Sequence, residues 1–507
     1  MQSANPDAQA IWQTPLVQIG TPLFALHSMP QPPQLSTSLL EPASHPPSPA
    51  PPSVEVVPDD VPPAPPLPCS VPLQPTDTMP KRVALLHEIW PASSPVREAG
   101  MAYQLDEAGE GRLRDYFGKI GSRLRDKRQR ASFAIYAMGV LGEGERKSCE
   151  PIAARACGDP AEVDNMHNQL LHFLRASPWD NQAVRLVAAR YAIDALSASE
   201  PVTTWVLDDT GFLKQGVHSV GVQRQYTGSA GKTTNCQIGV SLSVATRSAH
   251  VPIDFELYLP KSWVDDPERR AEAKIPAEMT FETKIDLGLK MIERAVRAAI
   301  PGEIVLADSA YGESHLFRET VRLLGLDYAV GIHATTTVWL LDAASRRHGD
   351  AVSVLQIGQS LGSSAFRRVT WREGTKGKLH SRFCFRRVKV ANEDGIEPAK
   401  HEAVWLMIEW PLGESKPTKF TLTTLPRRMS KKRIVRTVKE RWRTEYAYEE
   451  LKGELGLDHF EGRSFPGWHH HVSVVLSCYA FVIAERVRHF PPSARGETRA
   501  DTLALAA

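Results

Sequence analysis

Apolar residues recur at three- and four-residue spacing between Leu105 and Ala198, and this spacing is typical of amphipathic helices that pack on one another. The pattern is clearest in four segments, GRLRDYFGKIGSRL, KRQRASFAIYAMGVL, VDNMHNQLLHFLRA and NQAVRLVAARYAIDAL. Asp164 and Asp180 stand at the starts of the last two, where a carboxylate can accept hydrogen bonds from the free N–H groups of a helix. We therefore predict an all-α domain over residues 100–198.

At Val202 the pattern changes to that of β-strands. The segment VTTWVLDD predicts a buried strand that ends in two aspartates, and two further strands and an amphipathic helix follow it. EIVLAD then predicts another buried strand, ending in Asp308, before a further helix and strand. This order indicates an α/β fold, in which helices flank a mixed sheet, and residues 199–332 form its first part.

A β-rich, basic segment at residues 333–426 interrupts this order, and residues 427–490 return to helices. We predict that the first range is an insertion and that the second completes the α/β core. Residues 1–80 contain 21 of the 39 prolines and no Lys or Arg, which predicts a disordered leader. Residues 491–507 are expected to form a flexible tail.

The formal net charge of +2 hides an uneven distribution, because residues 1–80 hold six acids and no base. The remaining chain carries a net charge of about +8, which is compatible with a polyanionic partner. The six cysteines form no CxxC pair, which argues against a zinc ribbon and favours a reducing cytosol. The most apolar run, Val472–Ala484, is too short to cross a bilayer, so no membrane association is expected.

Three carboxylates stand out by position: Asp208 and Asp308 at predicted strand ends, and Glu445 on a predicted helix. Acids with no His or Cys beside them suit hard divalent cations, Mg²⁺ above all and Mn²⁺ as an alternative. Two such ions can activate a water or a 3′-hydroxyl and stabilise the leaving oxygen in phosphoryl transfer. Each acid taken alone could equally be a helix cap or a surface ion pair.

In the stretch Lys431–His471, Arg441, Glu445 and Lys452 are spaced by four and seven residues, so on a helix the three side chains share a face. A carboxylate between two cations suits a group that holds a metal ion beside a phosphate. The alternative is a solvated helix face, whose ion pairs stabilise it by only about 0.2–0.5 kcal/mol each.

Several of these segments resemble DDE-type insertion-sequence transposases of the branch marked by a Tyr-x2-Arg-x3-Glu-x6-Lys signature, near the group typified by insertion sequence seven-oh-one. The resemblance rests on LDDTGFLKQGVHSVGVQRQY, GKTTNCQIGVSL, VLADSAYGE and RWRTEYAYEELKGELGLDHFEGRSFPGWHHH, and on LGEGERKSCEPIAARAC and LLHFLRASPW in the helical region. It covers roughly residues 100–490. It implies an RNase H-like core with a β-rich insertion between the second Asp and the Glu.

By this resemblance Asp208, Asp308 and Glu445 are the three metal-binding acids, and Arg441 and Lys452 are the signature cations. Val438 stands where the signature has tyrosine, which removes one phosphate-contacting hydroxyl. Asp209 is a rival for the first acid. We prefer Asp208 because the family motif reads Asp-x-Thr/Ser and Thr210 completes it, and because neighbouring strand residues point to opposite sides.

Two other motifs indicate a function less strongly than the three acids do. TGSAGKTT at residues 227–234 resembles a phosphate-binding loop, but it lacks the first glycine and a predicted strand follows it. We expect a basic loop near DNA, with Arg224, Tyr226 and Lys232 touching the backbone. The histidines at 469–471 have no second ligand pair for zinc, and we interpret them as the polar start of the last helix.

The predicted function is that of an insertion-sequence transposase in a bacterial cytoplasm, associated with the nucleoid when active. It would bind the terminal inverted repeats of the element, cut the DNA ends with Mg²⁺ and join the 3′-hydroxyls to target DNA, acting as a homodimer. The helical domain would bind the ends. The alternatives are an inactive DNA-binding relic and a metal-dependent nuclease without strand transfer.

Overall fold

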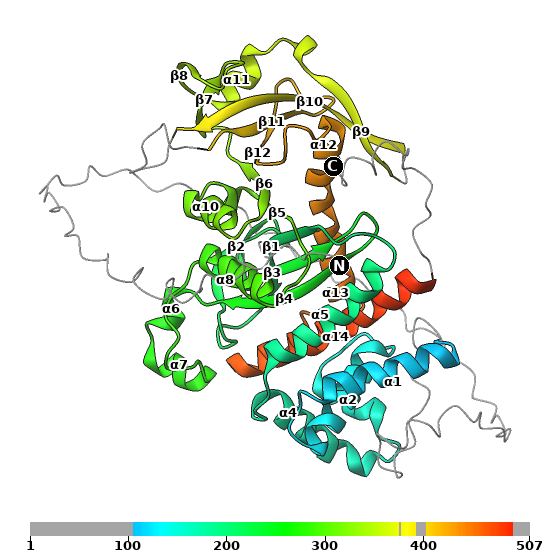
Figure 1. Ribbon diagram of the computed structural model, residues 1–507. Coiled ribbons are helices and arrows are strands. Elements are labelled where there is room, and N and C mark those ends of the chain that lie inside the picture. The colour runs from blue at the N-terminus through cyan, green and yellow to red at the C-terminus, as the bar shows by residue number, and fades with distance from the viewer. Residues whose placement is uncertain (1–104, 375–376, 392–401, 490–507) are drawn as a thin grey trace, which may run out of the picture. The chain divides into compact units, whose positions relative to one another are not determined.

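The computed structural model describes residues 105–374, 377–391 and 402–489 (Figure 1). The predicted leader, 1–80, and the predicted tail, 491–507, lie outside the described residues. No helix in the described ranges is long and apolar enough to cross a membrane.

The first described part of the chain is helical and includes all four segments with helical periodicity. Its elements are α1 (Glu107–Gly121), α2 (Lys127–Leu141), α3 (Cys149–Ala156), the 3-10 turn η4 (Pro160–Glu162), α4 (Val163–Arg175) and α5 (Asn181–Ser197). Asp180 caps α5 as predicted, since its carboxylate accepts from Gln182 N at 2.9 Å and Ala183 N at 3.0 Å. The expected cap at Asp164 is wrong, because η4 leads directly into α4 and places Asp164 within its first turn.

The described strands join one mixed sheet in the order β2-β3-β1-β5-β6-β12-β11-β10-β7-β8, with β4 beside β3 and β9 beside β10. The pairs β1–β5 and β5–β6 are parallel. The strands are β1 (Thr204–Leu213), β2 (Gln223–Thr227), β3 (Lys232–Ala245), β4 (His250–Tyr258), β5 (Ile304–Ala307), β6 (Asp327–Ile332), β7 (Thr337–Leu341), β8 (Arg347–Ser353), β9 (Arg367–Gly374), β10 (Gly377–Val390), β11 (Val404–Trp410) and β12 (Lys419–Thr423).

The β-rich segment predicted as an insertion extends this sheet. Its last strand, β12, pairs antiparallel with β6, with Phe420 opposite Ile332. Backbone hydrogen bonds therefore run without interruption from the strands that carry the predicted acids to those of the inserted segment.

Helices cover the sheet on both faces. They are α6 (Lys261–Val264), α7 (Pro267–Ala273), α8 (Lys284–Arg297), α9 (Ser309–Gly312), α10 (His315–Leu323), α11 (Val354–Ser360), α12 (Lys431–Lys439), α13 (Arg443–Gly453) and α14 (Phe465–His489), with 3-10 turns η5 (Ser363–Ala365) and η7 (Glu440–Trp442). Side chains along β1 point alternately to the two faces of the sheet. Leu207 packs on Gly288 of α8 on one face, whereas Val206 clusters with Ile434 of α12 on the other.

Helix α14 is buried along most of its length and packs against α2, α4, α5 and β4. Figure 1 shows it alongside α5. The interpretation of His469, His470 and His471 as a polar helix start is wrong, because all three side chains are buried. His471 Nδ1 accepts from the Tyr136 hydroxyl at 2.9 Å and its Nε2 donates to the Gly456 carbonyl at 3.1 Å.

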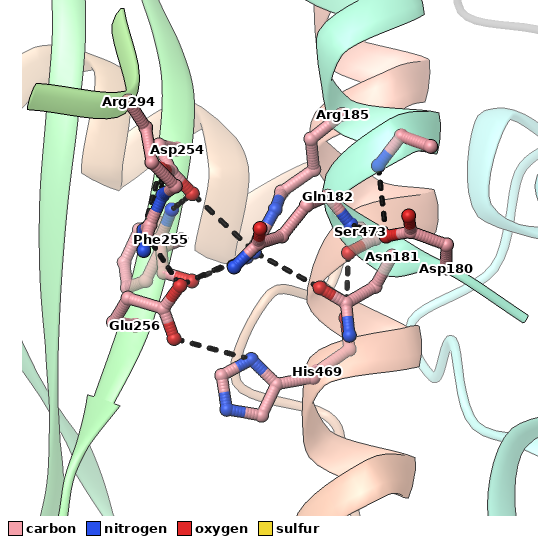
Figure 2. A network of polar contacts seen from close by, with 11 residues as sticks. Asp180, Asn181, Gln182, Arg185, Asp254, Phe255, Glu256, Arg294, His469 and Ser473 are labelled. Carbon is pink, nitrogen blue, oxygen red and sulfur yellow. Dashed lines mark hydrogen bonds and ion pairs between the residues drawn. The ribbon is translucent and has the colours of Figure 1, made fainter. Parts of the chain in front are cut away.

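A buried charge network also joins the helices to the sheet (Figure 2). Arg185 of α5 lies 3.3 Å from Asp254 and 3.4 Å from Glu256, both on β4. Arg294 of α8 reaches the same two carboxylates at 2.7 Å. His469 lies 3.8 Å from Glu256 on the other side. Two cations therefore balance two anions in a site from which water is largely excluded.

Candidate active site

The parallel register of β1 and β5 brings Asp208 and Asp308 to the same level of the sheet. Val206 lies opposite Leu306, so both aspartates stand two residues beyond a paired position. Asp308 directly follows β5 and caps α9, its carboxylate accepting from Ala310 N at 2.9 Å. The predicted position of Asp308 at the end of a buried strand is confirmed.

The predicted end of β1 at the two aspartates is wrong. β1 continues to Leu213, paired throughout with β3, and Asp208 lies opposite Ser241. β5 ends at Ala307 while β1 continues, so β5 does not pair with β1 beside Asp208, whose side chain is 14% exposed.

Neighbouring residues of β1 point to opposite faces and find different partners. Asp208 Oδ2 lies 2.6 Å from Arg441 Nη1, on the α13 side. Asp209 Oδ2 lies 3.0 Å from Lys284 Nζ of α8, on the other side. Only Asp208 therefore shares a face with the helix that bears Glu445.

The helix predicted to carry Arg441, Glu445 and Lys452 together is not continuous, because Arg441 lies in the 3-10 turn before α13. α12 ends at Lys439, η7 tightens the backbone, and α13 begins at Arg443. A 3-10 turn has about three residues per turn, so it rotates the side chains relative to a continuous α-helix. The break lets Lys439 pair with Glu409 of β11 at 2.5 Å while Arg441 turns to Asp208.

Arg441 is the electrostatic centre of this group. Burial by itself lowers its pKa, but the carboxylates of Asp208, Asp308 and Glu445 raise it, and the net pKa lies above the ordinary value. The three predicted acids thus act on one guanidinium, although Glu445 in the first turn of α13 is exposed to solvent.

Burial also shapes the acids. Burial raises the pKa of Asp208, Arg441 lowers it and Asp308 raises it, and the net pKa is about 6. Burial likewise raises the pKa of Asp209, where Lys284 opposes it. Because Asp308 raises the pKa of Asp208, a cation bound beside Asp208 would oppose this effect and favour its charged form.

Lys452 does not lie beside the carboxylates. Its Nζ donates to Thr210 Oγ1 and Gly211 O at 2.8 Å each, and to Ser229 Oγ at 3.2 Å. It therefore connects the last turn of α13 to β1 and to the glycine-rich turn between β2 and β3. Burial lowers its pKa, and Asp458 partly restores it.

The other two predicted cations lie on the β2–β3 hairpin. Arg224 pairs in register with Asn235, and Lys232 with Thr227. Both side chains are exposed, and in the described residues neither has a recorded contact with the three acids. A strand follows the glycine-rich turn, as expected for a loop that is not an NTPase site.

Tyr448 is a residue of this region that the sequence did not single out. Its hydroxyl lies 2.6 Å from Ser241 Oγ, which is the register partner of Asp208. Burial raises its pKa strongly, and Asp208 adds to this. The spacing of three from Glu445 could have indicated it, since residues three apart share a helix face.

The donor chemistry fits a hard cation. The acids at this edge offer only carboxylate oxygens, the ligands that Mg²⁺ prefers, and no His or Cys accompanies them. Across the described ranges, no three His, Cys, Asp or Glu side chains are close enough together to hold a metal ion as they stand. The charges of Asp208, Asp308 and Glu445 all act on Arg441, which places the three carboxylates around one guanidinium.

Comparisons with known proteins agree with this arrangement. A family model described as DDE superfamily endonuclease matches residues 119–378, and one described as transposase DDE domain matches residues 283–481. A protein of Microchaete diplosiphon named "Probable transposase for insertion sequence element IS701" is 29% identical over 221 residues, covering 43% of this chain. The match spans about half, 53%, of that relative's length.

Proposed function

Since the chain belongs to the DDE superfamily of endonucleases, we propose that it is the transposase of a bacterial insertion sequence. It binds the terminal inverted repeats, cleaves DNA at the element ends, and joins the 3′-hydroxyl ends to target DNA. The observation that carries this proposal is the alignment of Asp208 and Asp308 on parallel strands. Arg441 forms an ion pair with Asp208, and the charges of Asp308 and Glu445 also act on Arg441.

Asp208, Asp308 and Glu445 would hold Mg²⁺, or Mn²⁺ in its place, within an RNase H-like core. Bound there, the cations would lower the pKa of an attacking water or hydroxyl and stabilise charge on the leaving oxygen. Arg441 stands within reach of Asp208 and would hold a phosphate oxygen beside the scissile bond. Lys452 would fix β1, and Arg224 and Lys232 would contact the DNA backbone farther out.

Asp209 has a different part in this proposal. Its ion pair with Lys284 lies on the α8 face, so it would hold β1 in place and not bind metal. We expect two copies of the chain to act together, one at each end of the element, near the nucleoid.

The test uses the full chain, labelled DNA that carries the inverted repeats flanking the gene, a supercoiled target plasmid and Mg²⁺. The wild-type protein should cut the ends and join them. Asp208→Asn, Asp308→Asn and Glu445→Gln should each abolish cutting and retain binding to the ends. Asp209→Asn, the matched control on the opposite face, should retain most activity.

The outcomes separate the alternatives. Cutting without joining would identify a nuclease, and binding without cutting would identify a relic. An active Glu445→Gln protein would remove Glu445 from the site. An active Asp208→Asn protein with an inactive Asp209→Asn protein would move the first acid by one residue.

A further inference from the structure

Three cations gather at the start of α12, away from the carboxylates. Lys431 opens the helix, Arg427 precedes it by four residues, and Arg387 comes from β10. Lys431 and Arg387 lie on Trp405 of β11: the Lys431 ammonium is 3.0 Å from the ring centroid and the Arg387 guanidinium 5.0 Å. Cation–π contacts of this kind hold the charges in fixed positions.

Among the described residues, no ion pair joins a carboxylate to Lys431 or Arg427. Burial and the charges of Arg387 and Arg427 lower the pKa of Lys431 to about 8. Glu402 acts on Arg387, but it also pairs with Arg322 at 3.3 Å. Like charges therefore repel one another here, and an anion would relieve the repulsion.

The helix itself adds to the positive potential. α12 starts with Lys431, Lys432 and Arg433 and has no acid in its first turn. The helix dipole places a partial positive charge at the same end, where acidic side chains are normally stabilising. Lys432 and Arg436 are exposed on the solvent side of α12, so the positive surface continues along the helix.

We propose that Arg387, Arg427 and Lys431 form a second phosphate-binding site, whose ligand is the phosphodiester backbone of duplex DNA and which continues along Lys432 and Arg436 toward α13. The inference rests on the proposed function, because the ligand is the DNA that the carboxylates would cut. Figure 1 shows α12 leading into α13. The 3-10 turn η7 joins the two helices, so the cations of α12 and Glu445 of α13 lie on consecutive helical segments.

The experiment measures binding of the full chain to a fluorescein-labelled 30-base-pair duplex of arbitrary sequence, in EDTA, from 50 to 300 mM KCl. The variants are Lys431→Met, which keeps an apolar side chain on Trp405, and Arg427→Gln. Lys290→Gln is the matched control, since Lys290 lies on α8, on the other face of the sheet, and pairs with Glu282. Lys431→Arg tests for rescue by a retained charge.

We expect each loss of charge at the cluster to reduce the slope of log affinity against log salt by about 0.9, and affinity in 0.1 M salt by roughly fivefold to tenfold. Lys431→Arg and Lys290→Gln should bind like the wild type. Equal binding by Lys431→Met, Arg427→Gln and the wild type, with end cleavage intact, would overturn the second site alone.

Two further results would also count against the proposal. Competition by inorganic phosphate beyond that of chloride at equal ionic strength would show that the ligand is free phosphate. Failure of the wild-type protein both to bind the duplex and to cut element ends would overturn the proposed function together with this inference. Thermal melts of each variant separate lost contacts from lost folding.

Discussion

At the scale of single residues, Lys452 shows how one side chain can serve both the fold and the chemistry. Its ammonium makes three hydrogen bonds that join α13 to β1 and to the β2–β3 turn. Hydrogen bonds from a charged donor are worth about 1.5–3 kcal/mol each. The sequence pattern suggested a phosphate ligand, and the contacts add the positioning of Thr210, two residues beyond Asp208.

Lys452→Gln should therefore lower the free energy of unfolding by about 1–3 kcal/mol, less than the three bonds together, because it also removes the cost of burying the ammonium. Arg441→Gln should slow single-turnover cleavage by far more than it destabilises the fold, since its guanidinium faces the acids. Urea unfolding and single-turnover cutting, measured on both variants, check this. A Lys452→Gln protein with wild-type stability would contradict the positioning role.

The buried histidines of α14 predict a dependence of stability on pH. Burial lowers the pKa of His470 and of His471 to about 4, below the unfolded value of about 6.5. The folded state then binds fewer protons than the unfolded state as the pH falls. Stability is therefore complete above about pH 6.5 and is lost progressively toward pH 4.

At pH 5 each of these histidines should lower the free energy of unfolding by about 2 kcal/mol relative to neutral pH. His471→Gln should be less stable than the wild type at pH 7.5, since it disturbs the bonds to Tyr136 and Gly456, but should lose less stability between pH 7.5 and 5. His172→Gln, at an exposed position of α4, should match the wild type. Urea unfolding at both pH values is the measurement, and equal pH dependence in all three proteins would refute the assignment.

At the scale of elements, the short helix α9 positions Asp308 through its packing on β6. A Cβ on Gly312 would lie 1.9 Å from the Gly331 carbonyl oxygen, so this position admits no side chain without moving backbone. Asp308 is the N-cap of the same helix, and any displacement of α9 is passed to its carboxylate.

Gly312→Ala should lower stability by about 1–3 kcal/mol, the usual cost of overpacking, and should reduce cutting by more than tenfold at a temperature where the variant is folded. Gly118→Ala is the control: nothing lies within 4 Å of its Cβ position on exposed α1, so it should stabilise by about 0.5–1 kcal/mol. Thermal melts and end cleavage test both. A fully active Gly312→Ala protein would mean that Asp308 tolerates displacement.

At the scale of the whole molecule, α5, β4, α8 and α14 meet at the charge network of Figure 2. Arg185 is 2% exposed and contacts both Asp254 and Glu256. Removing one partner of a buried charge pair leaves an uncompensated charge in a poorly solvated site, which commonly costs 3–5 kcal/mol. The helical segment and the sheet should therefore unfold together.

Arg185→Met should lower the free energy of unfolding by about 3–5 kcal/mol and preserve a single transition. Arg190→Met, an exposed position on the same helix, should change it by less than about 0.5 kcal/mol. Calorimetry together with tryptophan fluorescence tests whether one transition describes both parts. Two separate transitions in the wild-type protein would show that the network does not couple them.

The sequence by itself determined the order of the elements and the placement of the acids along the chain. Helical periodicity located α1, α2, α4 and α5, and the run of β-branched residues before Asp308 located β5. These signals are local: they depend on side-chain spacing and caps within one segment, which the sequence states directly.

Only the tertiary structure decided how those residues meet. β1 runs past Asp208 because β3 supplies hydrogen bonds from a distant segment, and on either side of the 3-10 turn η7 Lys439 pairs with Glu409 and Arg441 with Asp208. The burial of His471 and the contacts of Lys452 depend on helices that are remote in sequence. No spacing of residues in the sequence predicts such contacts, since each forms only when the sheet brings both partners together.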